Sequence, residues 1–181
     1  MTAIAEPPAE HDRPSYRSDR FGAQDGFAYR FDWGLDGLRT LAPHVDVVVV
    51  VDVLRFTSAV SAAVDSGATV FPYPWADDGA PAYAQERRAI LAGRREHHEP
   101  SLSPTDLLQL DASTRLVLPS PNGSALAFAA REHGARHVLA GCIRNASKTA
   151  AAARKLVGSS GTVAVIAAGV RWLDASAPLR P

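Results

Sequence analysis

Runs of apolar residues alternate with alanine-rich, amphipathic stretches over most of this chain. The clearest run is formed by the five valines 47–51, which are followed by Asp52, Val53 and Leu54. A continuous β-branched run is typical of a strand that is buried on both faces, as in a parallel sheet. The next stretch, residues 58–65, predicts a helix that ends at Gly67.

The same unit of strand, turn, helix and glycine then recurs along the chain. A repeated strand–helix order predicts an α/β domain with a mainly parallel sheet that helices cover on both faces. We expect this single domain over residues 26–181, after a loosely ordered tail over residues 1–25. The predicted strands are 27–31, 47–52, 115–118, 136–140 and 162–167, and the predicted helices are 35–41, 58–65, 124–132 and 146–156.

Residues 71–111 interrupt this order and contain several prolines. They include a predicted helix over residues 82–92 and the charged stretch 94–99. The adjacent residues His97 and His98 point in different directions on a helix or a strand, so they form a poor chelate. We therefore interpret this stretch as a solvated loop rather than as a metal site.

Composition and charge narrow the classes of function. The chain has 181 residues, with 19 basic and 19 acidic side chains. Balanced charge gives no overall attraction to nucleic acid or to an anionic membrane, and no apolar run is long enough to span a bilayer. The first residues lack the pattern of a secretory signal. The single cysteine, Cys142, cannot form an internal disulfide, so we expect a cytoplasmic protein.

Polar residues gather in the turns that follow the predicted strands. Right-handed connections place such turns at one edge of a sheet, and helix N-termini with arginines nearby favour an anion, above all phosphate. A simpler interpretation of Thr57, Ser124 and Asn145 is that they cap helices, but this leaves Asp52 and Arg55 unexplained. The full set comprises Asp52, Arg55, Thr57 and Ser58, then Ser120, Asn122 and Ser124, and finally Arg144 and Asn145.

The motifs of several familiar phosphate-handling and hydrolytic enzymes are absent. The chain has no Gly-x-x-x-x-Gly-Lys loop, no Gly-x-Ser-x-Gly elbow and no glycine-rich first turn. Cys142 is not followed by an arginine six residues later, where Lys148 stands. Spacing alone therefore predicts an anion-binding α/β domain and leaves the mechanism open.

Four segments resemble, in order, the motifs of the 2-phosphosulfolactate phosphatases of coenzyme M biosynthesis. The first resembles that family's Ile-Asp-Val-Leu-Arg-Ala-Thr-Ser segment, and the second its Gly-Asn-Ser-Pro element. The third resembles its Thr-Thr-Asn-Gly-Thr turn, and the fourth its Gly-x-x-x-Asn turn. In this chain they are Val-Asp-Val-Leu-Arg-Phe-Thr-Ser (51–58), Ser-Leu-Ser-Pro-Thr-Asp (101–106), Ser-Pro-Asn-Gly-Ser (120–124) and Ala-Gly-Cys-Ile-Arg-Asn (140–145).

The resemblance implies a magnesium-dependent phosphatase that cleaves the phosphate ester of a small sulfonated hydroxy acid. Asp52 would bind the Mg²⁺ ion or act directly in catalysis, together with Arg55 and Asn122. The attacking group, a side chain or water, stays open. The residues that would contact the anionic substrate are Thr57, Ser58, Ser103, Gly123, Ser124, Arg144 and Asn145.

The chain also departs from the family pattern. Arg94 stands where the family has an acidic residue, Leu102 replaces an asparagine, and the Glu-Asp pair expected after Gly169 is missing. These departures support two alternatives, namely a non-catalytic anion-binding or partner-dependent domain and a truncated piece of an active enzyme. Because the family's last strands and helices are absent, we also expect an exposed apolar face that a second copy of the chain covers.

Overall fold

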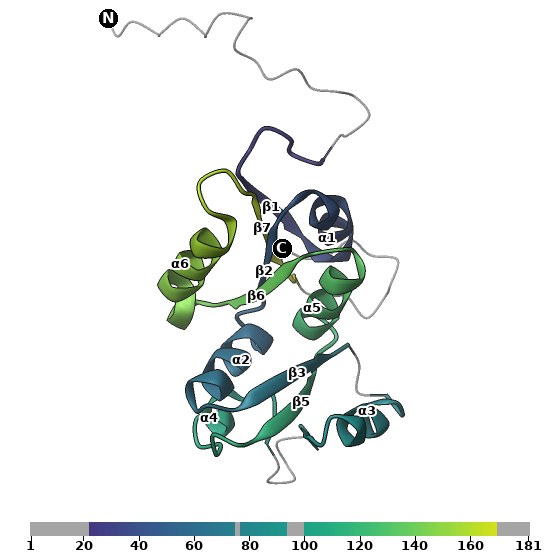
Figure 1. Cartoon of the computed structure of the whole chain (residues 1–181). Helices are drawn as coiled ribbons and strands as arrows, with labels where there is room; N and C mark the ends of the chain where they lie inside the picture. The colour runs from purple at the N-terminus through teal and green to yellow at the C-terminus, as the bar shows by residue number, and fades with distance from the viewer. Residues whose placement is uncertain (1–21, 75–76, 94–99, 170–181) are drawn as a thin grey trace, which may run out of the picture.

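Figure 1 shows the computed structural model, which describes residues 22–74, 77–93 and 100–169. Several predictions concern residues outside these ranges. They include most of the N-terminal tail, the charged stretch 94–99 with Arg94, His97 and His98, and the chain beyond Gly169.

Two all-parallel sheets organise the described part of the fold, with strand orders β1-β7-β2-β6 and β3-β5-β4 (Figure 1). The α/β class with parallel strands and flanking helices is thus confirmed, but the strands are divided between two sheets. The strands are β1 Tyr29–Trp33, β2 Val47–Val51, β3 Thr69–Tyr73, β4 Ile90–Leu91, β5 Arg115–Pro119, β6 His137–Gly141 and β7 Val163–Ala167. The helices are α1 Gly34–Leu41, α2 Phe56–Asp65, α3 Ala80–Glu86, α4 Pro104–Leu107, α5 Gly123–Glu132 and α6 Ala146–Val157, with short 3-10 turns η3 Ala42–His44 and η5 Ile143–Asn145.

The valine run forms β2, which lies between β6 and β7 in the first sheet. Val48 and Val50 pack in a cluster with side chains of α1 and α5. Val47 and Val49 point to the other face, where they pack with Ala153 of α6. Burial on both faces explains why this strand has no polar alternation.

The helix α2 joins the first sheet to the second. Its residues Phe56, Ala59 and Ala62 are buried against Leu116 and Leu118 of β5. Figure 1 shows α2 and α5 lying between the two sheets. The small residues of α2 allow close approach, so the second sheet is held by packing against helices that start at the edge of the first.

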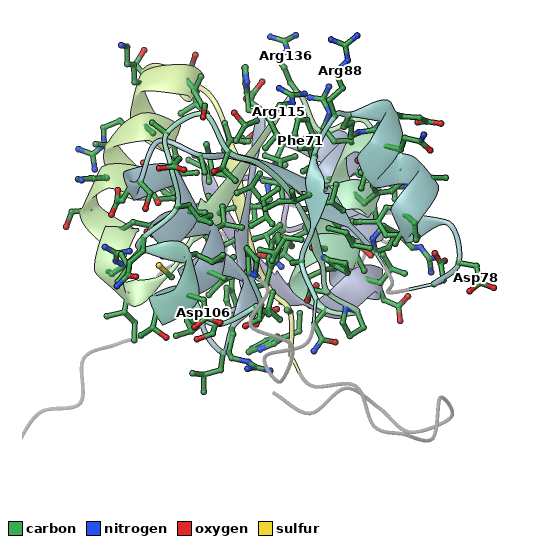
Figure 2. The ribbon with its side chains drawn as sticks, turned by 90° about the horizontal axis from the view of Figure 1, so that it is seen from below. Phe71, Asp78, Arg88, Asp106, Arg115 and Arg136 are labelled. Carbon is green, nitrogen blue, oxygen red and sulfur yellow. The ribbon has the colours of Figure 1, made fainter. Side chains whose placement is uncertain are left out.

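Two strands of the second sheet, β3 and β4, were not predicted from the sequence. Strand β3 includes Pro72, which a strand tolerates because β3 lies at the edge of its sheet. The predicted helix over residues 82–92 is wrong at its end, because α3 stops at Glu86 and β4 follows. Arg88 adopts φ 49°, a left-handed conformation that cannot continue a helix. Figure 2 shows Arg88, Arg115 and Arg136 projecting on the same side of the molecule.

Asp46 ties the start of β2 to the start of β7. Its Oδ2 accepts hydrogen bonds from the backbone N of Thr162 at 2.9 Å and from Thr162 Oγ1 at 3.2 Å. The backbone hydrogen bond from Thr162 is the main reason that the pKa of Asp46 lies below its ordinary value of 3.8. The carboxylate therefore helps to fix the register of two central strands.

We expect Asp46→Asn to lower the free energy of unfolding by about 1 kcal/mol at pH 7, because a partly exposed charged hydrogen bond is lost. The contribution of a carboxyl with a depressed folded pKa is present above its unfolded pKa and disappears as the pH falls through the folded value. The difference between the two proteins in urea denaturation should therefore shrink below pH 3.8. The control is Asp36→Asn, since the Asp36 side chain is 94% exposed. An equal loss for the control, or a loss that persists at low pH, would contradict the assignment.

Candidate active site

The carboxyl ends of β2 and β5 meet, although the two strands belong to different sheets. The backbone N of Gly123 donates a hydrogen bond to Oδ2 of Asp52 at 2.9 Å. Asp52 directly follows β2, and Gly123 is the first residue of α5. Helix α2 begins at Phe56, in the same turn as Asp52. The junction thus places a carboxylate where two helices begin, and helix N-termini favour negative charge.

Two hydroxyl side chains hold the turn after β2. Thr57 is fully buried, and its Oγ1 accepts a hydrogen bond from the backbone N of Asp52 at 3.0 Å. Ser58 Oγ donates to the backbone O of Val53 at 2.8 Å. Neither hydroxyl caps α2, whose N-cap position is occupied by Arg55. Thr57 and Ser58 therefore fix the backbone that carries Asp52.

The turn after β5 contains a polar atom without a partner. Ser124 is fully buried, and its Oγ donates to the backbone O of Leu118 at 2.7 Å. Asn122, which immediately precedes Gly123, has its N–H directed at Ser120 Oγ at 3.4 Å. Oδ1 of Asn122 is buried and accepts no hydrogen bond from the described residues. Because a buried unsatisfied acceptor is costly, this oxygen is a strong candidate for contact with a ligand.

Burial and nearby polar groups shift the pKa of the Asp52 carboxyl in opposite directions. Burial raises its pKa above the ordinary value of 3.8, while the backbone amides of Gly123, Phe56 and Arg55 and the charge of Arg55 act in the opposite direction. The side chain of Arg55 is exposed, and no ion pair is recorded for it within the described residues. Arg55 is thus available to a substrate anion that approaches Asp52 from solvent.

Gly123 has no room for a side chain. A Cβ atom at this position would lie 2.7 Å from Asp52 Oδ2 and 2.3 Å from Cδ1 of Phe56. Both distances are shorter than any normal contact. Only glycine therefore allows the start of α5 to approach the carboxylate of Asp52 this closely.

The turn after β6 lies beside the turn after β2, because β6 and β2 are paired in register. Asn145 stabilises this turn, since its Oδ1 accepts from the N of Cys142 at 2.8 Å and its Nδ2 donates to the O of Ala140 at 3.0 Å. Although Asn145 occupies the N-cap position of α6, its side chain does not cap that helix.

Arg144 and Ser103 interact with residues outside the turn that carries Asp52. Arg144 forms an ion pair with Asp65 at 2.9 Å. Asp65 is the last residue of α2, about 13 Å along the helix axis from Phe56. Ser103 Oγ lies 2.8 Å from Thr105 Oγ1 near α4. Of the predicted site residues, Asp52, Arg55, Asn122 and Gly123 therefore lie together at the junction. Arg144 and Ser103 interact with residues outside it.

The oxygen atoms at the junction are of the kind that a hard divalent cation binds. Within residues 22–74, 77–93 and 100–169, no group of three or more His, Cys, Asp or Glu side chains is placed to hold a metal. Mg²⁺, however, commonly takes one or two carboxylates and completes its shell with water and substrate oxygens. The carboxylate of Asp52 and the unpartnered Oδ1 of Asn122 are oxygen donors of the required kind.

Comparison with known proteins agrees with the motifs. Residues 38–172 match the family model described as 2-phosphosulpholactate phosphatase. The chain belongs to this family. A family relative from Thermus thermophilus, named "Probable 2-phosphosulfolactate phosphatase", is 32% identical over 131 residues. This match covers 70% of the chain and 54% of the relative, so the chain spans about half the length of this curated family member.

Other features of the site and the fold lay beyond what the sequence indicated. The contact between Asp52 and Gly123 joins two sheets, which the sequence did not separate. The unpartnered oxygen of Asn122 depends on burial, which no motif reports.

None of the helices that the structure describes is long and apolar enough to cross a membrane.

Replacing Gly123 by alanine tests the close approach directly. Helix propensity alone would make Gly123→Ala stabilising by about 1 kcal/mol. We expect the opposite sign, a loss of about 2 kcal/mol or more, because the new Cβ displaces Asp52 or Phe56. Urea denaturation measures the change, and Ala125→Gly in the same turn of α5 serves as the control for propensity. A stabilised Gly123→Ala protein would show that the junction is looser than the structure indicates.

Proposed function

We propose that this chain is a phosphatase that hydrolyses a small anionic phosphate ester such as 2-phosphosulfolactate, with Mg²⁺, at the junction of β2 and β5. The observation that carries the proposal is the contact between Asp52 and Gly123, which brings a carboxylate, an exposed arginine and an unpartnered amide oxygen to two helix N-termini. Family membership and the name of the relative support the reaction class.

Each residue of the junction has a chemical role in this proposal. The guanidinium of Arg55 binds oxygens of the phosphoryl group or of a second acidic group on the substrate. Asp52 acts as a ligand for the metal or directly in catalysis, and the amide of Gly123 fixes the direction in which its carboxylate points. Asn122 supplies an uncharged acceptor oxygen beside it. A bound Mg²⁺ ion would neutralise charge on the phosphoryl oxygens.

The hydroxyl residues act mainly by positioning. Thr57 and Ser58 hold the backbone around Asp52, and Ser124 holds the start of α5. Asn145 orders the neighbouring turn after β6. Catalytic geometry depends on such supporting contacts, because small displacements of a reacting group reduce the rate strongly. In this proposal their side chains contribute by keeping Asp52 and Asn122 in place.

The first test is phosphate release from 2-phosphosulfolactate by the purified chain. We expect release in the presence of Mg²⁺, loss of release with a chelator, and a decrease of about 100-fold or more in kcat for Asp52→Asn. The control is Asp78→Asn, because Asp78 is exposed and projects from the periphery of the molecule (Figure 2). This control should keep its activity within a factor of about two.

Two results would refute the proposal. One is a folded chain that releases no phosphate from this ester or from other small acidic phosphate esters. The other is an Asp52→Asn protein with unchanged kcat, which would remove Asp52 from the reaction even if the chain is a phosphatase.

Asn122→Ala separates a functional role from a structural one. Removing an unpartnered buried oxygen should not lower the free energy of unfolding of the ligand-free protein, since no hydrogen bond of the side-chain oxygen is lost. Activity should nevertheless fall by about 10-fold or more if this oxygen contacts the metal or the substrate. Parallel urea denaturation and rate measurements check both parts. Reduced stability with normal activity would assign Asn122 to the fold alone.

A further inference from the structure

A cavity of about 320 Å³ lies between the two sheets, where Figure 1 shows α2 and α5. Val138, Leu139 and Ala140 of β6 line one side of it, and Val70 and Pro72 of β3 line the other. Within the described residues, β6 pairs only with β2 and β3 only with β5, so both are edge strands. The volume of the cavity falls within the range of about 300–1,000 Å³ that is typical of small-molecule sites.

Apolar side chains form most of the wall of this cavity. Val60 of α2 and Ala127 of α5 complete the wall between the two edge strands. Val60, Val70 and Leu139 are only half-buried, although each lies on an element that faces the space between the sheets. Such side chains lose exposed area and gain dispersion contacts when an apolar molecule occupies the cavity. The body of a fitting ligand is therefore apolar.

Arg131 is the one charged residue among those that line the cavity. It lies in the last turn of α5, about 12 Å along the helix axis from Gly123. Its Nη1 donates to the backbone O of Arg136 at 3.3 Å, and Arg131 forms no ion pair with any described residue. A basic residue also favours a helix C-terminus, but that role does not require it to line a cavity. The other N–H groups of the guanidinium can bind a carboxylate.

The side of the molecule at the end of α5 is basic. Arg136 directly precedes β6, and Figure 2 shows it projecting on the same side as Arg88 and Arg115. Within the described part of the chain, none of these three arginines forms an ion pair. Asp46 lies within the electrostatic influence of Arg136, but its carboxylate is held by hydrogen bonds at the start of β7. The local positive charge favours an anionic group at this end of the cavity.

We propose that this cavity binds a small carboxylate with an apolar body, such as the anion of a medium-chain fatty acid. The carboxylate binds the guanidinium of Arg131, and the apolar body lies between β3 and β6. This site is separate from Asp52, so the proposal does not depend on the phosphatase reaction. Phe56 lines the cavity and also lies beside the position of a Gly123 Cβ. A bound ligand therefore also supports the packing that brings Gly123 to Asp52.

Calorimetric titration of the full chain with octanoate and with phenylpropionate tests the proposal. We expect at least one of the two to bind one-to-one with a submillimolar Kd. Arg131→Gln should weaken the binding of that carboxylate by about 10-fold or more, because the charged hydrogen bonds are lost. Its neutral amide should bind Arg131→Gln and the unsubstituted protein equally. The matched control is Arg88→Gln, an exposed arginine on the same side that does not line the cavity, and its Kd should stay within about two-fold.

Filling the cavity supplies a second readout. Ala127→Leu, or Val60→Phe from the opposite wall, should abolish binding in a protein that urea denaturation shows to be folded. On addition of the carboxylate to the unsubstituted protein, the methyl resonances of Val70, Val138 and Leu139 should shift. Three results would overturn the proposal, namely no binding of either carboxylate, an unchanged Kd for Arg131→Gln, or methyl shifts confined to residues outside the cavity. Undiminished binding to a folded, filled variant would likewise place the carboxylate elsewhere.

Discussion

The hydrogen bond between Gly123 and Asp52 is the constraint on which the site depends. It joins residues 71 positions apart and connects the turn of one sheet to the turn of another. The bond forms only because position 123 lacks a side chain, since a Cβ would collide with Asp52 and Phe56. The same requirement places the start of α5 beside the start of α2. Geometry at the site is therefore determined by how closely the two sheets pack against the helices between them.

The distance between the two sheets depends on the size of the side chains buried between them. Ala59, Ala62 and Ala63 of α2 are fully buried, and Phe56 fills the space at the head of the helix. Larger residues would move β5 away from β2 and would separate Gly123 from Asp52. Phe56 thus serves the core and the site together, because it lies beside the position where the Gly123 Cβ would be. Residues with no contact to a substrate can in this way control the distance between groups that do have one.

The sequence alone predicted the helices and strands whose patterns of apolar residues are strongest. The valines 47–51 predicted β2, and the alanine-rich stretches predicted α2, α5 and α6 to within a few residues. The two-sheet division could not be predicted, because an apolar strand does not encode which strand it pairs with. Strand β3 was obscured by Pro72, whose tolerance depends on an edge position that only the assembled sheet defines. At the site, the polar turns indicated Asp52 and Asn122, but the engagement of Arg144 by Asp65 depends on tertiary contacts.

The order of the strands along the chain has a consequence for folding. The chain enters the first sheet with β1 and β2, builds the whole second sheet, and returns to the first sheet with β6 and β7. Asp52 lies at the exit to the second sheet and Gly123 at the return from it. Closing a loop of this length is slow compared with forming a local turn. The junction needs the turn after β5 as well as the turn after β2, so a nascent chain cannot form it before residue 123 has been synthesised.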